Sequence, residues 1–267
     1  MLKDITLGQY FPGNTVIHRL DPRTKLLLTI VYIVALFLAK NYFSYLLMLV
    51  FLITCIVISK IKPKVILRGM KPLFIVIVFT GILNLFYTKG DPIVEFWIFS
   101  ISWAGIKSAV FMILRIMMLV TGTFLLTYTT APMQLTDGLE SLLGPLKATK
   151  LPVHELAMMM SIALRFIPTL IEETDKIMSA KKARGADFES GNIMHRAKAM
   201  LPLLIPLFIS AFRRADELAI AMESRCYHGG KGRTRMKQLR YRLCDAGAFA
   251  VCAVVLGGVI VLRSFGL

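Results

Sequence analysis

Residues 181–188 read KKARGADF, and residues 222–229 read MESRCYHG. Each stretch closes a long amphipathic segment, and each places one arginine between two small residues. The two triplets are Ala183, Arg184, Gly185 and Ser224, Arg225, Cys226. Because two segments that end alike predict two helices that act alike, these arginines are the starting point for the fold.

The apolar residues ahead of each arginine recur at steps of three and four, with one step of seven in the first segment, which is the spacing of a helix face. They predict one helix over about Pro152–Arg184 and a second over about Ala199–Arg225. Gly185 stands where a left-handed carboxyl-terminal cap is expected. The two stripes are Leu156, Met160, Leu164, Ile167, Ile171 and Met178, then Leu204, Phe208, Ala211, Ala215, Leu218 and Met222.

A shift of forty-one residues superimposes the two segments, so that Arg184 falls on Arg225. The residues seven and fourteen positions before each arginine are apolar and lie on one edge of its stripe. Each arginine therefore continues the line of that edge. The helix dipole favours cations at a carboxyl end by about 0.3–1 kcal/mol, which does not explain one arginine at matching positions. Guanidinium forms bidentate pairs with carboxylates. We therefore predict two arginines that enter acidic pockets on two similar soluble partners, or on a dimer.

The composition favours a membrane protein with basic cytoplasmic parts over a soluble domain with a basic surface. The 267 residues are 56% hydrophobic and carry a net charge of +16. The first twenty-five residues lack the apolar core of a secretory signal. Five runs approach the roughly 20 residues that a spanning helix needs, and the first is short enough to borrow from its flank. The runs are Leu26–Ala39, Tyr42–Ser59, Pro72–Thr88, Gly105–Thr130 and Ala246–Leu262.

Lysine and arginine set the expected orientation, because they accumulate in cytoplasmic loops. They are frequent before the first run and between the second and third, and sparse at 40–41 and 89–104. The prediction is an all-α membrane protein with about five transmembrane helices, a cytoplasmic amino terminus and an external carboxyl terminus. Its parts are a cytoplasmic segment at 1–25, transmembrane helices at 26–131, a cytoplasmic domain of long amphipathic coupling helices at 132–245, and a last transmembrane helix at 246–267.

Three features leave alternatives open. The loop Lys89–Ala104 is either an interfacial hairpin or a re-entrant piece. Arg115, inside the fourth run, is either functional or a residue that snorkels to the membrane surface. The segment Met200–Phe212 lies along or under the membrane, or dips in as a further crossing, although thirteen residues with two prolines are short for that.

The sequence offers no chemistry of its own. The four cysteines, Cys55, Cys226, Cys244 and Cys252, are not spaced as metal ligands and are expected to be reduced. No phosphate-binding glycine loop, metal site or nucleophile set is present. We expect no cofactor, metal or catalysis in this chain. The basic stretch 229–242 stands just before the last run, where anionic lipid explains it more simply than nucleic acid.

The chain resembles the transmembrane coupling subunit, or T component, of energy-coupling-factor ABC transporters for vitamins and metal ions. The resemblance covers nearly the whole length. The stretches that carry it are VIHRLDPRTKLLLT (16–29), ALRFIPTLIEETDKIMSAKKARGADF (163–188) and PLFISAFRRADELAIAMESRCYHG (206–229). The second arginine motif of that family commonly ends in glycine. Here the bulkier Cys226 takes that position, and a small shift of the helix end is one expected consequence.

The resemblance implies that two ABC-type ATPase subunits dock on Arg184 and Arg225. ATP and magnesium would be bound by those partners. A separate membrane-embedded subunit would bind the vitamin or ion and rest on apolar faces of the coupling helices. Its expected contacts are Leu156, Met160, Leu164, Phe208 and Phe212. Two alternatives stay open: a membrane-anchored scaffold for other acidic cytoplasmic partners, and a self-sufficient permease.

Overall fold

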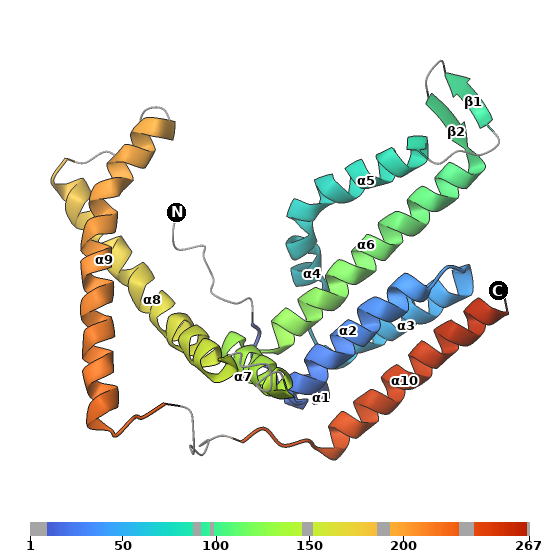
Figure 1. Ribbon diagram of the computed structural model, residues 1–267. Helices are drawn as coiled ribbons and strands as arrows, with labels where there is room; N and C mark the ends of the chain where they lie inside the picture. Colours follow the sequence, from blue (N-terminus) through green and yellow to red (C-terminus); the bar gives the residue numbers. More distant parts are fainter. Residues whose placement is uncertain are drawn as a thin grey trace. The chain divides into compact units, whose positions relative to one another are not determined.

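The computed structural model describes residues 10–87, 92–96, 99–145, 152–185, 193–229 and 238–265. Nearly all of this part of the chain is helical (Figure 1). The all-α class is therefore confirmed, with one short hairpin added. The helices are α1 (Val16–Arg19), α2 (Pro22–Leu38), α3 (Tyr42–Ser59), α4 (Pro63–Met70), the 3₁₀ turn η2 (Lys71–Leu73), α5 (Phe74–Tyr87), α6 (Trp103–Thr129), α7 (Pro132–Leu142), α8 (Val153–Ala183), α9 (Ile193–Ser224) and α10 (Leu243–Ser264).

The chain divides into two compact units. One holds α1 to α7 and α10, and the other holds α8 and α9. The predicted divisions at 131/132 and 245/246 concern the membrane and stay a prediction. By contacts alone, α7 belongs with the first unit because Gly138 lies directly against Pro22 of α2. A methyl group at Gly138 would stand 3.1 Å from the Pro22 Cβ.

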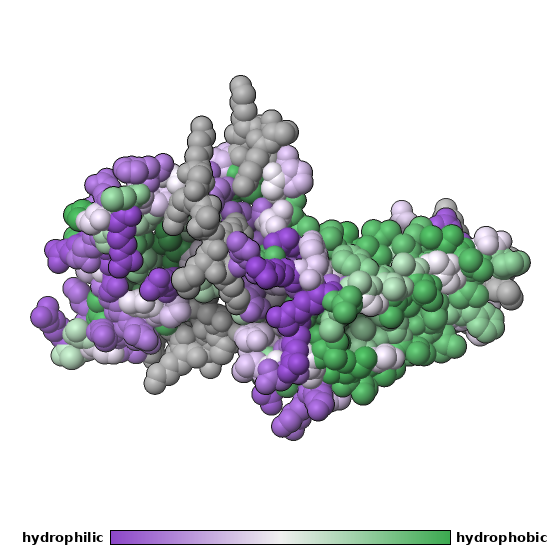
Figure 2. Space-filling model, turned by 90° about the horizontal axis from the view of Figure 1, so that it is seen from below, coloured by the Kyte–Doolittle hydropathy of each residue, from purple (hydrophilic) through white to green (hydrophobic). Residues whose placement is uncertain are grey.

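The core of the first unit is built from apolar faces of α2, α3, α6 and α10. Leu36, Met48 and Val259 are fully buried, and Met118 of α6 packs against them. Much of the remaining surface of these helices is apolar and exposed, and Figure 2 shows it as a continuous hydrophobic face. A soluble protein seldom exposes so large a patch, because water penalises it. Lipid would not.

Five described helices are long and apolar enough to cross a membrane: Tyr42–Ser59, Pro63–Tyr87, Trp103–Thr129, Val153–Ala183 and Leu243–Ser264. The number agrees with the sequence prediction, but one member differs. The first predicted run forms α2, whose 17 residues are at the lower limit of a span. As expected it borrows from its flank, since the helix begins at Pro22. By length and composition α8 qualifies instead, although its carboxyl-terminal half carries Glu172, Glu173 and Asp175.

Two local predictions need revision. The segment between the second and third runs, expected as a loop, forms the helix α4. The second coupling helix begins at Ile193, six residues before the predicted Ala199. As in the predicted span Ala199–Arg225, it runs through Pro202 and Pro206. Each proline costs a backbone hydrogen bond, but a helix of 32 residues retains enough others to continue.

The loop between α5 and α6 contains an antiparallel hairpin. Strand β1 spans Pro92–Phe96 and β2 spans Phe99–Ser102, with Glu95 opposite Ser100. Of the two alternatives for Lys89–Ala104, the backbone matches the hairpin. Residues 88–91 and 97–98 lie outside the described part of the chain.

Candidate functional site

The first arginine motif ends α8 in a regular cap. The helix stops at Ala183, and Arg184 is the capping residue. The Gly185 amide donates to the Lys182 carbonyl at 3.0 Å, and Gly185 has a φ of +84°. This is the left-handed cap expected from the sequence, and glycine adopts it without steric cost.

The second motif ends α9 in the same way. The Cys226 amide donates to the Glu223 carbonyl at 2.9 Å, and the Tyr227 amide donates to the Met222 carbonyl at 3.0 Å. These two bonds define a Schellman cap. Cys226 takes the position of Gly185 and has a φ of +57°. The helices therefore stop at equivalent residues, Ala183 and Ser224, and Cys226 does not shift the end.

We expect Cys226→Gly to stabilise this cap. A left-handed conformation costs a residue with a side chain about 1 kcal/mol or more, and glycine avoids that cost. Hydrogen exchange of the Cys226 and Tyr227 amides should slow by about fivefold or more. Ser224→Gly is the matched control, because residue 224 is helical and glycine there should speed exchange. Faster exchange in Cys226→Gly would contradict the cap assignment.

Both guanidinium groups are accessible. Arg184, Arg225 and their four flanking residues are all exposed. Among the described residues, neither arginine has an ion pair or a side-chain hydrogen bond. The predicted line along each stripe also holds, since Leu170 and Ile177 in α8 and Ala211 and Leu218 in α9 are all half-buried. Each helix end thus presents an unpaired cation beside a partly covered apolar edge.

An ion pair joins the two coupling helices at equivalent positions. Arg214 Nη2 donates to Glu173 Oε2 at 3.0 Å, and residues 173 and 214 coincide under the forty-one-residue shift. Farther along, the Tyr227 hydroxyl lies 3.2 Å from the Met158 sulphur. Since the partner number falls as the α8 number rises, the two helices cross with opposed chain directions (Figure 1).

This contact relates the two arginine ends by an approximate two-fold axis. Antiparallel segments that touch at the same position of a repeat are exchanged by a rotation about that point. Arg184 lies eleven residues beyond Glu173, and Arg225 lies eleven beyond Arg214. Each end is therefore roughly 16 Å along its helix from the ion pair, in opposite directions. Two arginines at equal distances from the ion pair suit a pair of similar partners.

The expected contacts for a membrane partner lie on open apolar surface. Leu156, Met160, Phe208 and Phe212 are exposed, and Leu164 is half-exposed. The rings of Phe208 and Phe212 stack with their centroids 6.4 Å apart. Further exposed residues extend this face of α9 at helical spacing: Leu201, Leu204, Ile205 and Ile209.

A cavity of about 510 Å³ adjoins the second arginine. Met158 and Ile162 of α8 form one wall, Leu218 and Met222 of α9 form another, and Arg225 with Tyr227 stands at the end. The contact of Tyr227 with α8 was not predicted from the sequence. The signal for it was an aromatic residue directly after the cap.

The amino-terminal signature forms a separate, buried cluster in the other unit. Asp21 caps α2 by accepting from the Arg23 amide at 2.9 Å, while the Asp21 amide donates to Asp245 Oδ1 at 2.9 Å. Asp245 also accepts from the Arg242 amide at 2.7 Å and so caps α10. The cluster ties the starts of α2 and α10 together across more than two hundred residues of chain.

Lys25 is the centre of this cluster. Its ammonium donates to the carbonyls of Thr129 at 2.9 Å and His18 at 3.2 Å, and to the Thr130 hydroxyl at 3.2 Å. The side chain is buried. The pKa of His18 lies below its usual value, chiefly because the ring is withdrawn from water and also because of the Lys25 charge. A neutral imidazole can accept from Thr15 and donate to the Phe11 carbonyl.

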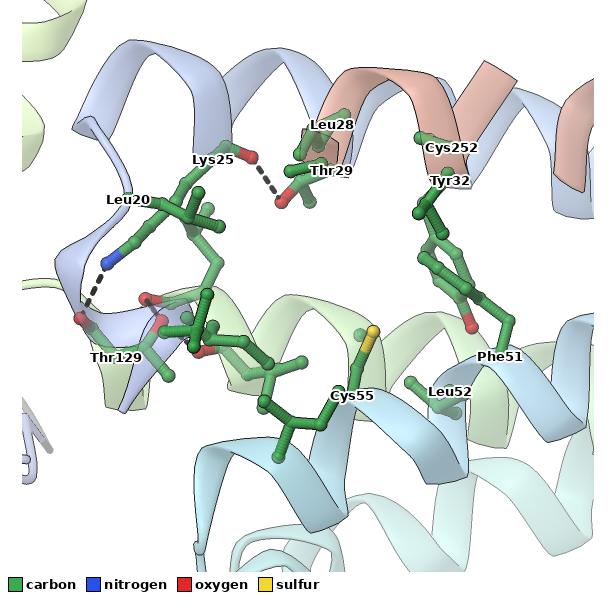
Figure 3. Close-up of a pocket in the computed structure, with 18 of the residues that line it drawn as sticks. Leu20, Lys25, Leu28, Thr29, Tyr32, Phe51, Leu52, Cys55, Thr129 and Cys252 are labelled. Carbon is green, nitrogen blue, oxygen red and sulfur yellow. Dashed lines mark hydrogen bonds between the residues drawn. The ribbon is translucent and has the colours of Figure 1, made fainter. Parts of the chain in front are cut away.

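An apolar cavity of about 440 Å³ lies beside Lys25 (Figure 3). Tyr32, Phe51 and Cys55 line it, and the Lys25 side chain is directed to Thr129 at its edge. The ammonium is already satisfied by three oxygens, so the cavity offers no free polar group of that lysine. Within the described residues no group of three metal-ligating side chains occurs, and all four cysteines are free thiols.

Comparison of the sequence with known proteins finds a matching family. A family model described as CbiQ, cobalt transport protein, matches residues 13–236. A relative from Thermosediminibacter oceani is 55% identical over 98% of this chain and 99% of its own. Relatives from Ruminiclostridium cellulolyticum (53%; 98% of each chain) and Listeria innocua (46%; 99% of this chain, 100% of its own) are similar throughout. All three are named energy-coupling factor transporter transmembrane protein EcfT.

Proposed function

Because the chain belongs to the family of energy-coupling factor transporter transmembrane proteins, a family of multi-pass membrane transport components, we propose that it docks two ATPase subunits through Arg184 and Arg225. The membrane identity and the transport role follow from the family. The docking sites and the partners are the proposal.

The observation that carries the proposal is the matched pair of helix ends. Two exposed arginines without partners among the described residues lie at equal distances from the Glu173–Arg214 ion pair. A buried acidic pocket that receives such an arginine gains a charge-assisted, bidentate contact. Two equivalent arginine side chains related by an approximate two-fold axis suit a pair of similar subunits that close and open together.

The same geometry suggests how motion is passed on. A change in the separation of the two ATPases would act at the tips of α8 and α9, and rigid helices would transmit it to their exposed apolar faces. We assign the contact with a membrane-embedded substrate-binding subunit to Leu156, Met160, Leu164, Phe208 and Phe212. Their exposure in the isolated chain supports this, since a surface of that kind gains free energy when covered.

In this proposal the chain is a non-catalytic subunit. ATP and magnesium are bound by the partner ATPases, and the vitamin or metal ion is bound by the substrate-binding subunit. The amino terminus and the coupling helices face the cytoplasm of the cell, where ATP is available. The basic stretch 229–242, of which 230–237 lie outside the described residues, then faces anionic lipid rather than nucleic acid.

Affinity purification of the tagged chain from its native membrane tests the proposal. Two ATPase polypeptides and a small membrane protein should be recovered with it. Recovery of other acidic cytoplasmic proteins without ATPases would instead support a scaffold. Substrate flux in liposomes that contain only the purified chain would support a permease.

A further inference from the structure

A cavity of about 390 Å³ lies in the unit that holds α1 to α7 and α10, at the opposite end of α2 from the Lys25 cluster. Its walls come from the α2–α3 turn, α3, α5 and α6. The lining residues are Lys40, Tyr45, Asn84, Lys107, Ser108, Phe111, Met112 and Arg115. Three of these side chains are cations, and none is an acid.

Arg115 is anchored within this cavity but not neutralised. Its Nε donates to the Tyr45 hydroxyl at 2.8 Å, and its Nη2 donates to the Ala39 carbonyl at 3.3 Å. Ala39 caps the carboxyl end of α2, where a cation is favoured by the helix dipole. A guanidinium has five donors, and the described residues engage two of its nitrogens. Among those residues no carboxylate pairs with Arg115, Lys40 or Lys107.

The residues around the cavity are typical of the level of lipid headgroups. Tyr42, Tyr87 and Trp103 are exposed at this end of the bundle. Tyrosine and tryptophan gather at membrane interfaces, where one side of the ring is apolar and the other is wet. The Lys107 ammonium lies 4.8 Å from the centre of the Tyr42 ring, and Lys107 also lines the cavity.

We propose that this cavity binds the phosphate group of an anionic phospholipid. Three cations around one cavity repel one another, and a bound anion removes that cost. Phe111 and Met112 provide an apolar wall on which the first part of an acyl chain can lie. A zwitterionic headgroup is a poorer occupant, because it brings a further cation among the three already present. The proposal concerns lipid and is independent of ATPase docking.

Native mass spectrometry of the full chain, exchanged from detergent into vesicles of phosphatidylglycerol mixed with phosphatidylcholine, tests the proposal. The wild-type chain should retain one phosphatidylglycerol with a preference of at least about tenfold over phosphatidylcholine. Lys40→Gln with Lys107→Gln should remove most of that preference. Arg115 is left in place, because its loss would also break the contacts with Tyr45 and Ala39.

The matched control is Lys62→Gln with Lys64→Gln, two exposed lysines at the start of α4 that do not line the cavity. It should retain the wild-type preference. Equal retention of the two lipids by the wild-type chain would overturn the proposal, as would an unchanged preference in the Lys40/Lys107 variant. Displacement of the lipid by millimolar inorganic phosphate would show a site for a free anion and would also overturn it.

Discussion

Replacing both arginines, Arg184→Glu together with Arg225→Glu, is expected to abolish co-purification of the ATPases and substrate uptake while the chain still inserts into the membrane. Reversal of a charge that enters an acidic pocket costs about 2–5 kcal/mol or more at each site. Because the two sites act on linked partners, the losses combine, and binding should fall by several orders of magnitude. Among the described residues neither arginine side chain makes an ion pair or a hydrogen bond, so the fold should not suffer.

The matched control is Arg165→Glu with Arg213→Glu. These arginines are exposed on the same two helices, and the net charge changes by the same amount. They do not stand at the caps, so ATPase recovery should stay near the wild-type level. The pair Arg184→Lys and Arg225→Lys should give an intermediate loss, because lysine keeps the charge but not the planar fork. Normal uptake by the double glutamate variant would refute the docking proposal.

Lys25→Met is expected to destabilise strongly the unit formed by α1 to α7 and α10. The substitution leaves the carbonyls of His18 and Thr129 and the Thr130 hydroxyl without their buried donor. Each unsatisfied buried group costs about 1–3 kcal/mol, so a loss of roughly 3 kcal/mol or more is expected. Thermal unfolding of the purified chain in detergent should shift downward by about 10 °C, since each kcal/mol moves the midpoint by a few degrees at this size.

Lys64→Met is the control for that experiment, because Lys64 is an exposed lysine near the start of α4. Its melting temperature should stay within a degree or two of the wild-type value. A second variant, Asp245→Ala, should lower the midpoint as well, since it removes the cap of α10 and the acceptor of the Asp21 amide. If Lys25→Met melted like the control, the ammonium would not be holding α2 to α6.

The coupling helices could be predicted closely because their signals are local. Helical spacing of apolar residues, small residues around an arginine and a terminal glycine placed the end of α8 within one residue. The start of α9 was predicted six residues too late, because residues 193–198 read IMHRAK and their basic residues interrupt the apolar spacing. The amphipathic helix α4 was missed because its lysines resemble a charged loop.

The buried cluster around Lys25 could not be predicted. The stretch VIHRLDPRTK does not show that Lys25 hydrogen-bonds to Thr129, or that Asp21 hydrogen-bonds to Asp245. These partners lie more than a hundred residues away in the sequence. The same holds for Arg115. Its sequence context left a choice between function and snorkelling, and its three-cation cavity exists only once the α2–α3 turn lies beside α6.

The sequence by itself determined that the chain is helical, that much of it prefers lipid, and that two equivalent helix ends carry arginine. These properties follow from periodicity and local backbone preferences, which neighbouring residues set. The tertiary structure alone decided that the two repeats meet antiparallel at Glu173 and Arg214, and therefore that the arginines are related by an approximate two-fold axis. The reason is physical: a repeat fixes what two segments are, but only packing between them fixes how one is turned against the other.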